Sequence, residues 1–156
     1  MKRFLTLLLF SAGLTFAQSA YVAYNEAVLA GTASVVTVQQ PASNSARIVR
    51  FVAASLYCSA ACDVTLERNG TAATTTALTP TPINTTTSAA KAKAFSASNV
   101  GAGTVLSKYS LVAGGTMVID LAVMNLSGTG TTKNLTFRTS AITGTARITV
   151  QFNEEY

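Results

Sequence analysis

Short segments in which every second residue is apolar recur along this chain, and they constrain its fold more than any other feature. The clearest is residues 146–152, where Ala, Ile, Val and Phe alternate with Arg, Thr and Gln. Residues 63–68 and 134–138 alternate in the same way. Since successive side chains of a β-strand point to opposite faces, each segment predicts a strand with one face in a core and the other in water. We find no convincing helical period after Gln18.

Two further segments, residues 48–54 and 117–123, are apolar at most positions. Such runs are typical of strands in the middle of a sheet, which are covered on both faces. The chain also holds 24 Thr and 14 Ser, which compete poorly for the interior of helices. About eight short strands separated by glycine-rich turns predict one all-β domain, an antiparallel β-sandwich of jelly-roll or immunoglobulin-like topology.

The turn sequences predict where strands pair. We expect the last two alternating segments to form a hairpin around Thr143-Gly144, and Asn69-Gly70 to close a second tight turn, because Asn and Gly tolerate positive φ. The core face of the last hairpin would hold five apolar side chains: Leu135, Phe137, Ile148, Val150 and Phe152.

Residues 71–93 depart from the strand pattern. They are rich in Thr and Ala, contain no aromatic residue, and include Pro80 and Pro82. Proline cannot donate a hydrogen bond inside a central strand. We therefore expect a long surface excursion with at most a short edge strand near Leu78, within a single domain over residues 18–156.

The first 17 residues have the order of a secretory signal peptide. Lys2 and Arg3 precede an apolar run over residues 4–10, and small residues lie three and one positions before Gln18. The run is shorter than the roughly 20 residues that cross a membrane. We expect a cleaved signal helix over residues 1–17, a mature chain without a membrane span, and a secreted, periplasmic or cell-surface location.

Cys58 and Cys62 are the two cysteines of the chain. In an exported protein a disulfide between them is the expected state. Free thiols, a redox pair and a zinc site are the alternatives. The redox motif usually has two intervening residues rather than three, and a zinc site would need further ligands.

The composition argues against an enzyme, because the chain contains no His, the most versatile acid–base side chain. Ser107 and Lys108 are a neighbouring nucleophile and base, but adjacent strand residues point to opposite faces. For Asp120, within an apolar run, we expect a pairing with Arg50 or a turn hydrogen bond. Glu154 and Glu155 are expected to be solvated. We expect no catalytic, cofactor-binding or metal-binding residues.

Partners are also constrained by charge. Without residues 1–17 the chain has nine basic and six acidic residues, a net charge of +3, and the basic residues are scattered. Nucleic-acid binding, which needs clustered basic residues, is not expected. Four Asn-x-Ser/Thr sites are also expected to carry no glycan: Asn69, Asn84, Asn125 and Asn134.

These observations favour a non-enzymatic exported protein with a structural, assembly or surface-attachment role, whose partners are other copies or a cell or particle surface. The alternative is a ligand- or carbohydrate-binding module with residues 71–93 as the rim of its site. Residues 18–29 could complete a neighbour's sheet, or form an edge strand of their own. We expect contacts along strand edges that involve this segment, and a domain that folds without residues 18–24.

The signal-peptide interpretation predicts that the exported protein begins at or near Gln18. N-terminal sequencing of secreted material should find this start, because the small residues before Gln18 suit signal peptidase. A start at Met1 would contradict the interpretation.

Overall fold

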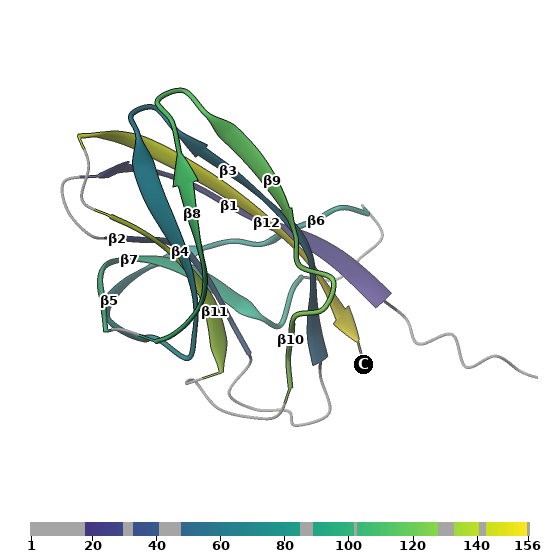
Figure 1. Cartoon of the computed structure of the whole chain (residues 1–156). Coiled ribbons are helices and arrows are strands. Elements are labelled where there is room, and N and C mark those ends of the chain that lie inside the picture. The colour runs from purple at the N-terminus through teal and green to yellow at the C-terminus, as the bar shows by residue number, and fades with distance from the viewer. Residues whose placement is uncertain are drawn as a thin grey trace, which may run out of the picture.

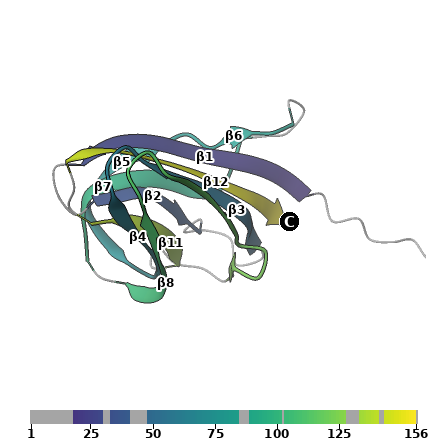
Figure 2. The same cartoon turned by 45° about the horizontal axis from the view of Figure 1, so that its top comes forward.

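The computed structural model describes residues 18–29, 33–40, 48–84, 89–101, 103–127, 133–140 and 143–155. These residues form twelve β-strands in two antiparallel sheets, which pack face to face (Figures 1 and 2). The predicted all-β sandwich is therefore confirmed. The expected signal peptide, residues 1–17, lies outside the described residues.

Each sheet contains six strands. The first sheet is formed by β1 (Gln18–Leu29), β3 (Ile48–Cys58), β6 (Thr81–Pro82), β9 (Thr116–Asp120), β10 (Asn125–Leu126) and β12 (Gly144–Glu155). The second sheet is formed by β2 (Ala33–Gln39), β4 (Cys62–Arg68), β5 (Thr71–Leu78), β7 (Lys93–Gly101), β8 (Thr104–Leu111) and β11 (Asn134–Thr139).

The strands pair in a nested order. β1 pairs with β12, β2 with β11, β3 with β9 and β10, and β4 with β8. Consecutive pairs alternate between the sheets, which gives the orders β1–β12–β3–β9 and β2–β11–β4–β8. This is the topology of a jelly roll, one of the two arrangements that the sequence predicts. Strands β5 to β7 are an insertion between β4 and β8.

The core lies between the sheets and follows the alternation of the sequence. The five side chains predicted to be buried have no exposed surface: Leu135, Phe137, Ile148, Val150 and Phe152. The ring of Phe152 lies 5.7 Å from that of Tyr21 and 6.4 Å from that of Phe51, measured between centroids. Aromatic pairs at such distances stabilise a core beyond the area that they bury.

Both predicted hairpins are wrong. Thr143 and Gly144 connect β11 to β12, but these strands belong to opposite sheets, so the connection crosses the sandwich instead of turning within a sheet. Asn69 has a φ of 60°, as its turn role requires, yet it leads from β4 to β5, which are not neighbours. Alternation identifies the buried face of a strand but not the sheet to which the strand belongs.

Of the two apolar runs predicted to be central strands, one is central and the other is not. Residues 48–54 lie in β3, which has β12 on one side and β9 and β10 on the other, as predicted. Residues 117–123 do not form a central strand: β9 ends at Asp120 and is an outer strand, and Val118 and Val123 are exposed by 72% and 89%. The carboxylate of Asp120 accepts the predicted turn hydrogen bond, from the amide of Ala122 at 2.8 Å.

Three crossings between the sheets meet at one end of the sandwich, and the predicted disulfide lies within one of them. Cys58 and Cys62 are bonded and close the connection from β3 to β4. The carbonyl of Cys58 accepts a hydrogen bond from Gly114, between β8 and β9, at 2.9 Å. The hydroxyl of Ser59 accepts one from the amide of Thr145, after the β11–β12 crossing, at 2.7 Å. The disulfide therefore anchors a turn to which both other crossings are bonded.

The expectation for the two C-terminal glutamates is wrong for Glu154. Its side chain is 1% exposed, because the alternation of β12 continues to this residue and turns it toward the interior. The carboxylate accepts hydrogen bonds from the amides of Lys91, at 2.8 Å and 3.1 Å, and Ala92. Glu155 lies on the other face and forms an ion pair with Arg50 at 2.5 Å, the arginine that the sequence analysis considered for Asp120.

This contrast predicts unequal effects of two neighbouring substitutions. Glu154→Ala leaves two amides without their acceptor, and should lower the free energy of unfolding by about 2–3 kcal/mol. Glu155→Ala breaks an ion pair with a half-exposed arginine, and should cost about 1 kcal/mol or less. Urea unfolding of both variants measures the difference, and equal losses would mean that Glu154 does not fasten the insertion.

Candidate functional site

Strands β5 and β7 of the insertion continue the second sheet beyond β2, and the sheet curls so that the start of β5 lies against the outer side of β11. Leu135 and Val38 point into the core, so their neighbours in β11 and β2 point outward, away from the first sheet. Outward side chains of a sandwich are normally solvated. Here Thr37 and Thr136 are nevertheless 0% and 1% exposed. The sheet therefore has a second buried layer on this face.

This second layer is polar and hydrogen-bonded. The hydroxyls of Thr37 and Thr136 lie 3.0 Å apart. Asn134 donates to the carbonyl of Gly70 at 2.8 Å and accepts from its amide at 3.1 Å, which fixes the start of β5 above the start of β11. Because buried polar groups need partners, these bonds determine where the insertion lies on the sheet.

An ion pair between a buried carboxylate and a partly exposed arginine completes the layer. Glu67 of β4 has no exposed surface, and its carboxylate lies 2.6 Å from Nη2 of Arg138 in β11. The other carboxylate oxygen accepts a hydrogen bond from the amide of Gly103 at 3.1 Å. Gly103 directly precedes β8, so this contact ties the end of the insertion to the sheet. A side chain at position 103 would meet the carbonyl oxygen of Arg68 at 2.5 Å, which explains the glycine.

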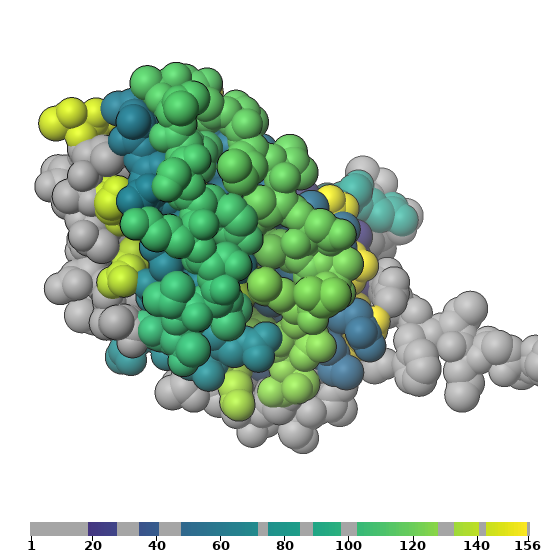
Figure 3. All heavy atoms as spheres, viewed as in Figure 1, coloured from purple at the N-terminus to yellow at the C-terminus, as the bar shows by residue number. Residues whose placement is uncertain are grey.

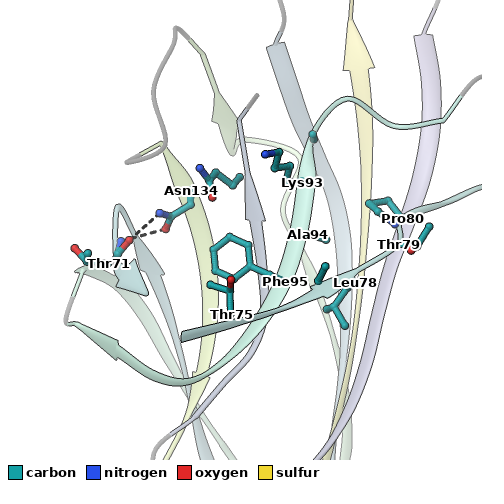
Figure 4. Close-up of a pocket in the computed structure, with 13 residues that line it drawn as sticks. Thr71, Thr75, Leu78, Thr79, Pro80, Lys93, Ala94, Phe95 and Asn134 are labelled. Carbon is teal, nitrogen blue, oxygen red and sulfur yellow. Dashed lines mark hydrogen bonds between the residues drawn. The ribbon is translucent and has the colours of Figure 1, made fainter. Parts of the chain in front are cut away.

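Between the insertion and the sheet lies a cavity of about 740 Å³ (Figure 4). Its walls combine apolar groups with hydroxyl and amide side chains and one cation. Phe95 and Thr75 lie beside each other in the centre of the view, between Asn134 and Leu78. The lining residues are Gln39, Gly70, Thr71, Thr75, Ala77, Leu78, Thr79, Pro80, Ala92, Lys93, Ala94, Phe95 and Asn134.

The sequence analysis located part of this site. Eight of the thirteen lining residues fall within residues 71–93, the proposed rim of a ligand site. The segment holds more structure than expected, because β5 is a full edge strand over Thr71–Leu78. Phe95 also lines the cavity but lies outside the predicted rim, because the excursion expected from the sequence ends at Lys93. The alternation of Lys93 and Phe95 around the buried Ala94 is the signal that could have found it.

The side chains weighed for catalysis do not gather into one site. Lys108 binds the carboxylate of Asp63 at 2.8 Å, and the hydroxyl of Ser110 donates to the same carboxylate at 2.6 Å. The ammonium of Lys108 and this hydroxyl hold the pKa of Asp63 below its ordinary value. In the described part of the chain, no three Cys, Asp or Glu side chains come together as potential metal ligands.

A second surface feature lies on β8, β9 and the turns that follow them. Residues 103–127, in green, make up much of the face shown in Figure 3. Seven large apolar side chains of the described residues are exposed, and five belong to this segment: Val105, Leu106, Val112, Val118 and Val123. We call these five residues the apolar strip.

The N-terminal strand belongs to this chain's own first sheet and lies near its edge, which is one of the two arrangements that the sequence analysis considered. β1 pairs with β12 along all of its residues, and Tyr21 and Val22 also pair with β6. Tyr21 and Ala23 have no exposed surface. Deletion of residues 18–24 would remove these core side chains, which argues against the expectation that the domain folds without them.

No protein-family model, curated protein or solved structure matches this chain. Within the described residues, no helix has the length and apolar character needed to span a membrane. Of the four Asn-x-Ser/Thr sites, Asn134 is 2% exposed and fully engaged with Gly70.

The polar layer predicts that Glu67 matters far more than Asp63, although both are ion-paired residues of β4. Glu67→Ala leaves Arg138 and the amide of Gly103 without their partner, and should cost about 2–4 kcal/mol of unfolding free energy. Asp63→Ala breaks a pair whose members are 61% and 37% exposed, and should cost about 1 kcal/mol or less. Chemical unfolding tests this, and a smaller loss for Glu67→Ala than for Asp63→Ala would contradict the assignment.

Proposed function

We propose that this protein is an exported, non-enzymatic jelly-roll module that assembles with other copies of itself through the face formed by β8 and β9. Export is supported by the order of residues 1–17 and by the disulfide between Cys58 and Cys62, since disulfides persist in oxidising compartments. A non-enzymatic role is supported by the absence of His from the sequence.

The apolar strip is the observation that carries the assembly proposal. Isolated exposed valines are ordinary, but five of the seven exposed large apolar side chains of the described residues lie in this one segment, which favours it as an interaction surface. Val112, Val118 and Val123 are each more than 70% exposed, so burial against a partner would remove most of their surface from water.

The strip lies beside two unpaired sheet edges. Among the described strands, β8 pairs with β4 alone and β9 pairs with β3 alone. The open sides present backbone N–H and C=O groups that another strand can bond. The one charged residue of β8, Lys108, is already neutralised by Asp63 of the same chain. A two-fold related copy would offer the same apolar side chains and the same free edges, which is the self-complementarity that a symmetric dimer requires.

The proposal predicts concentration-dependent association that a charge within the strip weakens. In sedimentation velocity, Val118→Asp should raise the dimer dissociation constant at least tenfold, about 1.4 kcal/mol. Ile83→Asp is the matched control, because Ile83 is 51% exposed and lies outside the strip, after β6. This control should associate like the unmodified protein.

Two results would contradict the proposal. One is a mature protein that stays monomeric at millimolar concentration. The other is an equal loss of association in both variants, which would indicate a general effect of charge and no role for the strip.

A further inference from the structure

We infer that the cavity beneath β5 and β7 is a binding site for a short anionic saccharide. This inference is independent of the proposed self-association, because the cavity and the apolar strip have no residue in common. The volume of about 740 Å³ lies within the range of roughly 300–1,000 Å³ that is usual for ligand sites.

The negative charge of the ligand follows from the distribution of basic residues. Four acidic side chains are each paired with a basic one: Glu26 with Arg147, Asp63 with Lys108, Glu67 with Arg138, and Glu155 with Arg50. Within the described residues, four basic side chains have no ion pair: Arg68, Lys91, Lys93 and Lys133, of which the three lysines are exposed.

Lys93 lines the cavity, and two of the other basic residues without an ion pair, Lys91 and Lys133, directly precede the lining residues Ala92 and Asn134 in the sequence. No acidic residue is among the described residues that line the cavity. Glu154 of β12 is buried, and its carboxylate is bonded to the amides of Lys91 and Ala92. The described lining therefore carries the positive charge of Lys93 and no negative charge, which favours an anion.

The saccharide character follows from the other lining groups. Phe95 offers a ring against which the apolar face of a sugar can lie, and Ala77 is its partner in the β5–β7 ladder. Thr71, Thr75 and Gln39 supply hydroxyl and amide groups that suit sugar hydroxyls.

The site is also held in place before a ligand enters. The amide of Asn134 is occupied by Gly70, so it shapes the wall and leaves ligand contacts to the threonines, Gln39 and Lys93. Lys93 and Gln39 are partners in the β2–β7 ladder, and Phe95 and Ala77 are partners in the β5–β7 ladder. Side chains on paired strands are well positioned for binding.

A nucleic acid fits these groups less well. Strand-binding grooves combine several stacking aromatics with a basic track along the backbone. This cavity has one aromatic ring and no arginine among its lining residues.

Isothermal titration calorimetry of the mature, disulfide-bonded protein tests the inference with four probes. These are trigalacturonate, a sulfated trisaccharide, a neutral trigalactoside and a short single-stranded oligothymidylate. At least one anionic saccharide should bind, and more tightly than the neutral one. Which of the two binds identifies the source of the charge, carboxylate or sulfate. The affinity should fall as the salt concentration rises, because exposed charges are screened.

Three variants locate the site. Lys93→Gln should weaken binding of the anionic saccharide at least tenfold and leave any binding of the neutral one unchanged. Phe95→Ala should weaken both, provided that its circular dichroism matches that of the unmodified protein. Lys108→Gln removes the same charge from β8, outside the cavity, and should leave the affinity unchanged.

The inference is overturned if neither anionic saccharide binds at millimolar concentration, or if Lys93→Gln and Lys108→Gln have equal effects. Tighter binding of the oligothymidylate than of both anionic saccharides would also overturn it, because the site would then be specific for a different class of polyanion.

Discussion

The burial of both faces of the second sheet is the constraint on which the rest of this structure depends. One face packs against the first sheet through Val38, Leu135 and Phe137. The other is covered by the insertion and carries Thr37 and Thr136, whose hydroxyls must find partners away from water. An apolar layer can slide with little penalty, whereas a polar layer is stable in the one arrangement that satisfies its hydrogen bonds. The insertion is therefore held by polar contacts. These contacts fix its position, and that position leaves the cavity between the insertion and β2 and β11.

The two ends of the insertion are fastened in the same way, by buried side chains that bond loop amides. Asn134 holds Gly70, Glu67 holds Gly103, and Glu154 holds Lys91 and Ala92. Because these hydrogen bonds hold the insertion at its ends, β5 and β7 need few apolar contacts. A segment so rich in Thr and Ala can therefore lie against the sheet. This arrangement leaves the cavity below the insertion, and Lys93, which has no ion pair within the described residues, lines it.

The sequence predicted much of the fold and less of the site, for physical reasons that individual residues show. Period-two alternation identified the buried side of β12, and its continuation would also have placed Glu154 inside. Alternation could not show that β11 and β12 belong to opposite sheets, because the strands of both sheets turn their apolar side chains toward the same core. The apolar run at Val118 suggested a central strand, but composition alone does not show which strand is the outer one, and Val118 is 72% exposed on the outer strand β9. Glu67 lies next to a bulge that shifts the register after Leu66, and no simple period predicts such a residue.

Hydrogen exchange of the amides of Gly70 and Gly103 tests the central claim most directly. Neither residue belongs to a strand, so their protection depends on the side chains of Asn134 and Glu67 rather than on a strand partner. If the polar layer holds the insertion against the sheet, both amides exchange slowly, at rates close to those of the core strands. Exchange as fast as that of an open loop at both glycines would show that the insertion does not cover the sheet, and would contradict the account.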